Sequence, residues 1–337
     1  MKKEETEYYK CPVCHGSLRL ETDESSTDSI ENGTLHCSQN SVFPVRKGVP
    51  NFIYPKKLSL HDSTVRDFYD GRAEAYDKNL HLTFKTHGED EVTLRNFFID
   101  QLELTPSSSV LEVACGTGRD SEIISKRLGA GGSLFLQDIS QHMLEHCQEK
   151  IDKYSIRRSF CLSNACFLPY PDNTFDALYS FGGLGEFSDI KGSLAEMVRV
   201  CKVGAKIVVG DESMPPWLRD TDYAKILTTT NKQFLADVPL KEIPVEAREV
   251  CLRWVIGRVF YLINFRVGEG EPKGNFDFVI PGIKGGTLRT RYEGQLEGVT
   301  PETKRMAQDA RERRKVSMHE WLDDVVRKAA KHDLDEK

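Results

Sequence analysis

The sequence of 337 residues has no apolar run that approaches the roughly 18 residues needed for a membrane-spanning helix. Its start, MKKEETEYYK, lacks the apolar core of a signal peptide. The nine cysteines are scattered and odd in number, which favours a reducing compartment over a disulfide framework. A formal net charge of -6 provides no general attraction to nucleic acid. These absences predict a globular cytoplasmic protein that is not held in a membrane.

The most informative stretch is a strand, a glycine turn and a helix between residues 110 and 129. The run Val110–Val113 is apolar except for Glu112, which predicts a short strand buried on both faces of a parallel sheet. Gly116 and Gly118 let the backbone turn tightly and approach a ligand, and the following helix offers free N–H groups at its start. This arrangement predicts a pocket for a nucleotide-like ligand.

The glycine pattern alone leaves the ligand open. A dinucleotide-binding fingerprint, Gly-x-Gly-x-x-Gly, would need a third glycine where Ser121 stands. An acidic residue just before a Gly-x-Gly turn instead resembles the first motif of class I S-adenosylmethionine (SAM) dependent methyltransferases, and Glu112 has that place. A strand-to-helix turn without any ligand is a further alternative. The segments that follow are therefore needed to decide between these interpretations.

Two later segments lie in register with the methyltransferase pattern. Ser133–Asp138 predicts a second strand that ends on an acid about 20 residues beyond Gly118, the spacing at which a carboxylate meets ribose hydroxyls. The stretch Asn164–Ser180 resembles the adenine-binding and fourth-strand motifs of the family, with Asn164 where the family commonly has Asp. Asn can still exchange hydrogen bonds with the adenine edge. Together these segments favour a SAM methyltransferase over a nicotinamide enzyme.

The resemblance implies which residues surround SAM. Tyr69 and Tyr76 match aromatic residues of a lid segment near the methionine half, although both can equally be half-buried residues of a surface helix. Ile139 and Met143 match positions that flank the adenine, and Met143 can also belong to the core. The predicted cofactor-binding residues are Tyr76, Glu112, Ala114, Gly116, Gly118, Asp138, Ile139, Met143, Asn164, Ala165 and Ser180.

The remaining pattern completes an α/β fold. Lys206–Gly210 predicts a fifth strand, and residues 250–256 and 259–265 predict an antiparallel pair. The resemblance then implies a Rossmann-like seven-stranded methyltransferase sheet with helices on both faces, over residues 62–270. We expect a small zinc-ribbon-like domain at 7–55 and a glycine-rich segment with C-terminal helices at 271–337. The insertion from Pro215 to Ala247 is expected to cover the acceptor pocket, as such insertions commonly do in the family.

The N-terminal unit lacks one ligand of a complete zinc site. Cys11 and Cys14 form a Cys-x-x-Cys knuckle, but Cys37 begins a second knuckle whose fourth position is Asn40. The layout resembles zinc ribbons beside rRNA guanine methyltransferases and in activators of tRNA methyltransferases. Structural zinc takes four ligands, so Cys11, Cys14 and Cys37 would need a histidine or water. The histidines beside them are His15 and His36. A ribbon that folds without metal, with its cysteines as small buried hydrophobes, is the alternative.

Methyl transfer requires little catalytic machinery, because SAM supplies the reactive group and the protein positions donor and acceptor. Asp211 and Glu212 follow the fifth strand, and Glu186 follows the fourth. Each could act as a general base, and each could equally be a positioning or solvated carboxylate. We take Asp211 and Glu212 as the candidate catalytic residues.

The C-terminal part carries a second candidate for acceptor binding. If Gly282–Tyr292 is extended, Arg289 and Arg291 project to one side and can bind a carboxylate or phosphate of the acceptor. A surface strand whose arginines pair with nearby acids is the alternative. Thr300-Pro301 and a Ser317–Glu320 capping box predict the starts of two further helices. The basic run 311–315 is expected to be solvated, with phosphate contact as the alternative.

Three functions fit these patterns. We expect a SAM-dependent methyltransferase for a small-molecule acceptor, because the insertion and the tail can enclose a pocket and the chain is acidic overall. The ribbon's resemblance to those of rRNA enzymes makes an RNA-base methyltransferase the alternative. A non-catalytic SAM-binding protein is the third, and the intact Gly116, Gly118 and Asp138 argue against it. The sequence does not indicate an oligomeric state.

Overall fold

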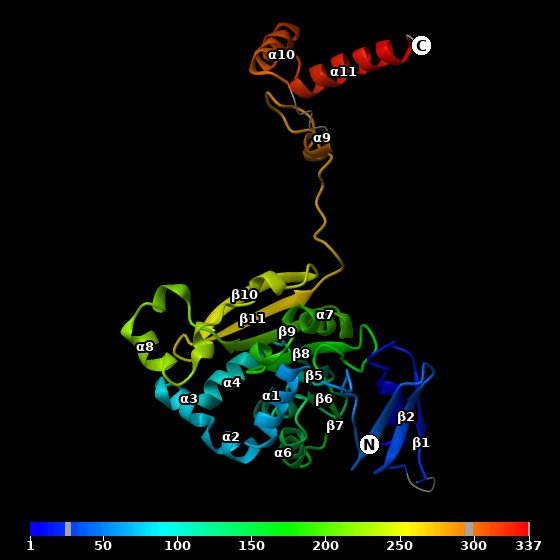
Figure 1. Ribbon diagram of the computed structural model, residues 1–337, viewed down its shortest axis with the longest axis vertical. Helices are drawn as coiled ribbons and strands as arrows, with labels where there is room; N and C mark the ends of the chain where they lie inside the picture. Colours follow the sequence, from blue (N-terminus) through cyan, green and yellow to red (C-terminus); the bar gives the residue numbers. More distant parts are fainter. Residues whose placement is uncertain (24–27, 294–298, 336–337) are drawn as a thin grey trace. The chain divides into compact units, whose positions relative to one another are not determined.

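The computed structural model describes residues 1–23, 28–293 and 299–335 (Figure 1). The chain forms two compact units, Met1–Glu271 and Pro272–Lys337. The first unit contains two β-sheets, and the second consists of helices and their connections. Within these described ranges, no helix is long and apolar enough to cross a membrane.

A seven-stranded sheet forms the centre of the first unit, in the order β10-β11-β9-β8-β5-β6-β7. The parallel strands are β5 (Ser109–Val113), β6 (Ser133–Asp138), β7 (Arg157–Leu162), β8 (Phe175–Phe181) and β9 (Cys201–Glu212). β10 (Ala247–Val255) and β11 (Phe260–Val267) complete the sheet as an antiparallel pair, with β11 beside β9. The predicted α/β sheet is therefore confirmed, including its antiparallel end.

Helices cover both faces of this sheet. On one face, apolar residues of α4 (Glu91–Asp100), α5 (Arg119–Arg127) and α6 (Gln141–Ile151) pack with Val110 and Leu134. On the other face, α7 (Ile190–Val200) packs with Leu111 and Val113. Successive residues of a strand point to opposite faces, so β5 supplies both cores in alternation. The carboxyl ends of the parallel strands stay open between these layers.

Three short helices precede α4, and a long insertion follows β9. The helices are α1 (Leu60–Asp70), α2 (Ala73–Asn79) and α3 (His81–Thr86), and together they are called the lid here. The insertion contains η3 (Pro216–Leu218), α8 (Asp222–Thr228), η4 (Lys232–Leu235) and η5 (Leu240–Glu242). A short turn, η2 (Leu184–Glu186), follows β8. Figure 1 shows α1–α3 beside α4 and α6.

The N-terminal residues form a small antiparallel sheet that shares a core with the large one. Its strands are β1 (Leu18–Glu21), β2 (Gly33–Cys37), β3 (Val42–Arg46) and β4 (Val49–Pro50), preceded by η1 (Lys3–Tyr8). The Tyr9 ring lies 4.9 Å from that of Phe52 and 5.6 Å from that of Tyr170. The Phe52 N–H donates to the Leu162 carbonyl at the end of β7. The small sheet therefore covers the exposed edge of the large one.

The second unit contains α9 (Leu288–Glu293), α10 (Pro301–Arg314) and α11 (Met318–Asp335). Thr300 caps α10 through Thr303 N–H, as its sequence predicts. The Ser317–Glu320 capping box before α11 is also present, because Ser317 N–H donates to Glu320 and Glu320 N–H donates to the Ser317 hydroxyl.

The prediction of an extended segment at Gly282–Tyr292 is wrong. Gly285 and Gly286 take positive φ angles of 57° and 66°, and the chain then enters α9. Residues two apart in a helix point to nearly opposite sides, so Arg289 and Arg291 do not share a face. Arg289 Nε donates to Asp277 at 2.8 Å, and Arg291 Nε donates to the Gly285 carbonyl at 2.9 Å. Both arginines bond within the second unit.

Candidate active site

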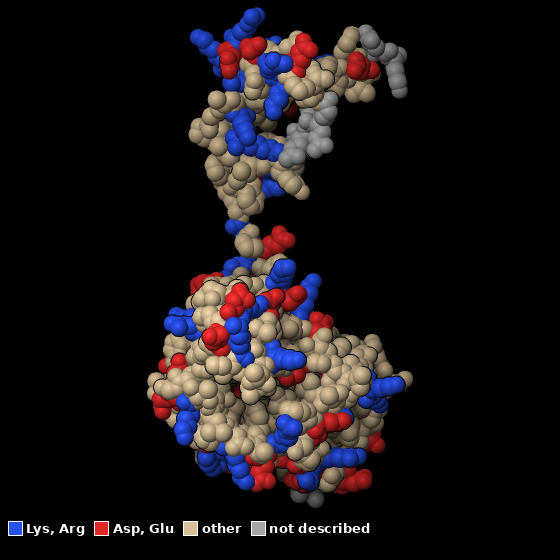
Figure 2. All heavy atoms as spheres, turned by 60° about the vertical axis from the view of Figure 1, so that its left-hand side comes forward, with Lys and Arg blue, Asp and Glu red and all other residues tan. Residues whose placement is uncertain are grey.

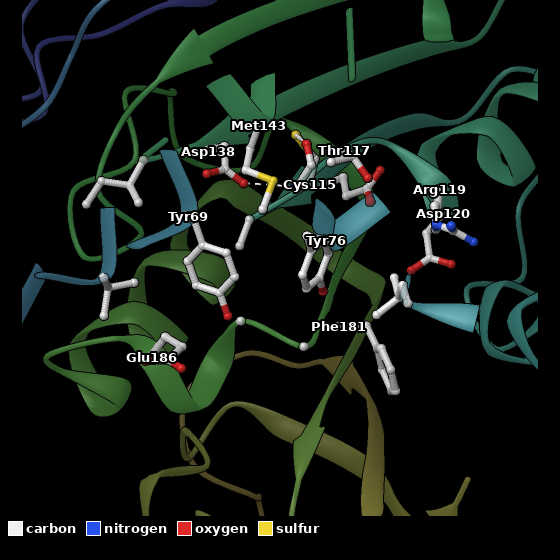
Figure 3. A pocket seen from close by; sticks show the side chains of 18 of the residues that line it. Tyr69, Tyr76, Cys115, Thr117, Arg119, Asp120, Asp138, Met143, Phe181 and Glu186 are labelled. Atoms are coloured by element: carbon white, nitrogen blue, oxygen red, sulfur yellow. Dashed lines mark hydrogen bonds between the residues drawn. The ribbon is translucent and has the colours of Figure 1, made fainter. Parts of the chain in front are cut away.

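A cavity of about 260 Å³ lies at the carboxyl ends of β5, β6, β8 and β9 (Figure 3). Its floor comes from these strand ends and from the turn after β5. Tyr69 and Tyr76 of the lid form one wall, and Ile256 and Phe260 at the β10–β11 turn form another. Open α/β sheets bind their ligands at this edge. The structure therefore places most of the predicted site residues in one cavity.

The turn after β5 has two glycines with different roles. Gly116 and Gly118 have φ angles of 53° and 82°, a region that favours glycine. A Cβ atom on Gly118 would lie 2.8 Å from the sulfur of Cys147, so this glycine allows α6 to approach the turn. A Cβ atom on Gly116 would meet nothing within 4 Å. Gly116 lines the cavity, so it leaves that space for a ligand.

Asp138 at the end of β6 supports this turn. Its Oδ2 accepts from Gly116 N–H and its Oδ1 accepts from Ser140 N–H, each at 2.8 Å. Burial raises the pKa of Asp138 to about 6, although the backbone hydrogen bonds oppose that shift. A carboxylate offers about four acceptor positions, so Asp138 can still accept hydroxyl groups from the cavity.

Glu112 lines the cavity but is held by the protein itself. Its Oε2 accepts from the Ser121 hydroxyl at 2.6 Å. Ser121 stands where a dinucleotide fingerprint has its third glycine, and its hydroxyl explains why a serine is useful there. Burial, together with the nearby charge of Asp120, raises the pKa of Glu112 well above its usual value. Glu112 is therefore a buried cavity residue whose position is fixed by Ser121.

Sequence reasoning missed Asp120, the second residue of α5. Its Oδ2 accepts from Arg95 Nη1 at 2.8 Å and from the Tyr179 hydroxyl at 3.2 Å. Its Oδ1 is buried and has no partner among the described residues, although Asp120 lines the cavity and is only 6% exposed. An unpaired buried carboxylate oxygen is costly, so it suits a cationic ligand group. The one local signal is an acid in the first turn of a helix.

Asn164 lies at another side of the cavity, beside Ala165, Ile139 and Met143. Asn164 Oδ1 accepts from Cys166 N–H at 3.0 Å, and its Nδ2 donates to Asp62 of α1 at 3.4 Å. Ala114 and Cys115 of the turn also line the cavity.

Ser180 departs from the prediction. It is fully buried within β8, its hydroxyl finds no partner in the described part of the chain, and it does not line the cavity. The reason is strand alternation, because Phe181 and not Ser180 points to the cavity. Phe181, Gly182 and Gly183 line it instead.

The two predicted catalytic carboxylates differ in their surroundings. Asp211 does not line the cavity, and its carboxylate accepts from Gly185 N–H and Glu212 N–H. Glu212 does line the cavity. Burial, together with a hydrogen bond to and the charge of Asp211, raises the pKa of Glu212 well above its usual value. Asp211 therefore joins the backbone of Gly185 to that of Glu212, and Glu212 is the one of the two carboxyls that lines the cavity.

The lining of the cavity also includes aromatic and acidic residues. Tyr69, Phe187 and Phe260 line it, together with Glu186 and Glu212. Phe181 stacks between Phe98 and Phe260, with ring centroids 4.8 and 5.7 Å away. Such walls suit a flat, apolar molecule.

Two arginines line the cavity in the described part of the chain, and both are already paired. Arg95 pairs with Glu91 and Asp120, each at 2.8 Å. Arg119 Nη1 pairs with Glu91 at 2.8 Å. The cavity is therefore not a basic site.

The insertion 215–247 does not cover the cavity as expected, since none of its residues lines it. Its Ala224 and Phe234 instead pack with Ile256, Val259 and Phe260 at the β10–β11 turn. The insertion therefore supports a cavity wall from behind.

The three N-terminal cysteines come together as predicted. The sulfurs of Cys11, Cys14 and Cys37 all lie within 4.8 Å of one another. Burial acts to raise the pKa of Cys37, but hydrogen bonds from Gln39 N–H and the neighbouring thiols outweigh it and lower that pKa. Among the described residues, no histidine adds a ligand atom to this cluster. His36 Nε2 lies 3.3 Å from Glu21 instead.

Comparisons with known proteins agree with this site. Residues 57–224 match the model of the ubiE/COQ5 methyltransferase family. Demethylmenaquinone methyltransferase of Lactiplantibacillus plantarum is 33% identical over 159 residues, which cover 46% of this chain and 65% of that protein. Ubiquinone/menaquinone biosynthesis C-methyltransferase UbiE of Cupriavidus necator is 35% identical over 113 residues, which cover 34% of this chain and 46% of that protein. The chain thus spans less than two thirds of the length of these curated relatives.

Among solved structures, a SAM dependent methyltransferase from Aquifex aeolicus is similar over 53% of this chain and 94% of that one, with 20% identity and a TM-score of 0.39. The family match extends across the lid, the glycine turn, Asp138 and the strands that hold them. Over residues 57–224 the chain is therefore similar to the ubiE/COQ5 methyltransferase family, and its seven-stranded α/β sheet holds the candidate site.

Proposed function

We propose that this protein methylates a ring carbon of a hydroxylated aromatic small molecule of the quinol type, with SAM as the methyl donor. The observation that carries the proposal is one cavity with two kinds of lining. The glycine turn and Asp138 line it, and so do aromatic side chains together with Glu186 and Glu212. The relatives named above act on quinones or in quinone biosynthesis by their names, which supports an aromatic acceptor.

The residues present fit SAM. Gly116 leaves an open cradle, Asp138 has free acceptor positions for ribose hydroxyls, and the unpaired Oδ1 of Asp120 suits the cationic amino group. The adenine would lie beside Asn164 and Met143. When bound, SAM supplies an electrophilic methyl group on a sulfonium.

An electrophilic methyl group requires an electron-rich acceptor, which is why the reduced, hydroxylated form of a quinone is proposed. Replacing a ring hydrogen by a methyl group releases one proton for each methyl gained. Glu212 is the carboxyl placed to take that proton. Its raised pKa makes it a stronger proton acceptor than an ordinary carboxylate, and Asp211 holds it in place through Glu212 N–H.

The surroundings favour a small molecule over RNA. RNA-binding sites are usually basic, whereas the acceptor end carries Glu186 and Glu212 and the arginines of the cavity are paired. On the face shown in Figure 2, Lys and Arg alternate with Asp and Glu over the first unit and do not gather in one patch.

The test is incubation of the full chain with SAM and 1,4-naphthoquinol, kept reduced, followed by mass spectrometry for ring methylation. We expect a methylated product and an equal amount of S-adenosylhomocysteine (SAH). Glu212→Gln should remove most of the activity, whereas Glu269→Gln at an exposed position should retain it. SAM left unconsumed with reduced naphthoquinols and benzoquinols alike would contradict the proposed acceptor class.

We also propose that Cys11, Cys14 and Cys37 hold a zinc ion, with water as the fourth ligand. Zinc–sulfur bonds of about 2.3 Å in a tetrahedral site place sulfurs about 3.8 Å apart, which is compatible with sulfurs that all lie within 4.8 Å of one another. Since the small sheet shares its core with the large one, zinc there would stabilise the whole first unit.

A further inference from the structure

One carboxylate joins the lid to the floor of the cavity. Asp77 lies on α2, directly after Tyr76, and its Oδ1 accepts from Thr117 Oγ1 at 2.7 Å and from Lys150 Nζ at 2.6 Å. Arg119 Nε donates to the same oxygen at 3.3 Å, and Arg119 also donates to the Asp77 backbone carbonyl. Thr117 belongs to the glycine turn and Lys150 to α6. The glycine turn with the start of α5, and α6, therefore converge on one side chain of α2.

Asp77 is charged in this position. Burial acts to raise its pKa, but hydrogen bonds from Lys150 and Thr117 outweigh it and lower the pKa. Its side chain is 29% exposed, so solvent screens the pairs only in part. Hydrogen bonds to a charged group are stronger than neutral ones.

The rest of the lid is held at different points. Asp70 of α1 accepts from the Ser140 hydroxyl at 2.6 Å and from His142 N–H at 3.1 Å. His61 of α1 bonds to the Glu186 carbonyl at 2.9 Å. These contacts hold α1. Among the bonds given above, every charged contact between α2 and the glycine turn is made by Asp77. Asp77 is thus the main link between Tyr76 and the turn.

The lid also lines the cavity directly. Tyr69 of α1 and Tyr76 of α2 are both lining residues, and their rings lie 5.8 Å apart. A ligand on the glycine turn would therefore meet the same helix that Asp77 holds.

We propose that Asp77 is a positioning residue that latches α2 onto the glycine turn and α6, so that lid closure and cofactor binding depend on each other. The proposal rests on the proposed function for the identity of the cofactor. Thr117 and Arg119 line the cavity and hold Asp77, and Asp77 in turn fixes the helix that carries Tyr76 beside the ligand. Linkage then requires that a substitution which weakens the latch also lowers the affinity for the cofactor.

Asp77→Ala tests the latch, and Glu74→Ala is its matched control. Glu74 lies on the same helix, is exposed and pairs with Lys78 at 2.6 Å. SAH affinity is measured by calorimetry, and hydrogen exchange is followed over residues 60–86 with and without SAH. We expect Asp77→Ala to lower the affinity for SAH about tenfold or more. We also expect the variant to lose most of the protection from hydrogen exchange that SAH gives the lid. Glu74→Ala should behave like the wild type.

A double-mutant cycle separates a latch from a general loss of stability. Lys150 has Asp77 as its ion-pair partner. Lys150→Ala should therefore lower the affinity for SAH in the wild-type chain, but should lower it little further in the Asp77→Ala background. Additive losses, or faster exchange spread over the whole sheet, would overturn the latch, and so would wild-type SAH affinity in Asp77→Ala. If the wild type fails to bind SAH, the proposed cofactor is wrong. The latch is then judged by lid exchange in ligand-free Asp77→Ala against Glu74→Ala.

Discussion

Cofactor binding should depend on pH through Asp138. Its pKa is raised to about 6, chiefly by burial. Ribose hydroxyls are bound by the ionised carboxylate, so the competent fraction falls as the pH drops below this pKa. At pH 5 about one molecule in eleven is ionised, against nearly all at pH 7.5, which predicts about tenfold weaker SAH binding at pH 5.

Calorimetric titration with SAH from pH 5 to 7.5 measures this dependence. Asp138→Asn serves as the control, because an amide does not titrate, and its weaker binding should vary little over the same range. Asp138→Ala at pH 7.5 should lose about 1.5–3 kcal/mol, or roughly ten- to a hundredfold in affinity. A pH-independent dissociation constant in the wild type, or unchanged SAH binding in folded Asp138→Ala, would refute this role.

Three further predictions follow from single contacts. Glu212→Gln should lower kcat, measured by the release of SAH, by a factor of about 10²–10⁴ and leave the affinity for SAH nearly unchanged. Equal losses of kcat and of SAH affinity would instead make Glu212 a cofactor-binding residue. Gly118→Ala should lower the free energy of unfolding by about 1–3 kcal/mol or more in urea, because its Cβ would lie 2.8 Å from the Cys147 sulfur; unchanged stability would show that α6 can retreat. Protein purified without chelator should contain about one zinc per chain by elemental analysis, and Cys37→Ser should lose it; a zinc content near zero in the wild type removes the metal and leaves the fold.

Local patterns predicted the elements that frame the site. The predicted strand Ser133–Asp138 is β6, and every residue of this strand is buried. An apolar run without alternation predicts such a strand, because a parallel sheet is covered on both faces. Ser140 caps α6 by accepting from Met143 N–H, as its position before the helix predicts. Such signals depend on neighbours in sequence, so one chain suffices to read them.

Contacts between distant segments could not be predicted in this way. Asp120 meets Arg95 across 25 positions, and Asp77 meets Lys150 across 73. Nothing beside either acid in the sequence marks a partner, because the fold brings them together. The roles of Asp120 and Asp77 therefore emerged only from the structure.

Misjudged local conformation explains the wrong prediction of an extended segment around Arg289 and Arg291. Their spacing fits one face of a strand, but Thr287 caps the turn by accepting from Thr290 N–H and α9 begins. A segment of six helical residues is too short for a periodic signal.

The central claim, that the turn after β5 holds SAM, is tested most directly by titrating SAH into the wild type, Gly116→Ala and Gly88→Ala. Both glycines have positive φ, 53° and 67°, and an added Cβ meets nothing within 4 Å at either, so the backbone cost is matched. Gly116 lines the cavity and Gly88 does not. The wild type and Gly88→Ala should bind one SAH per chain with similar affinity, whereas Gly116→Ala should bind at least about tenfold more weakly, because its methyl group occupies the ligand's space. Absence of SAH binding to the wild type, or equal affinity in Gly116→Ala, would contradict the account.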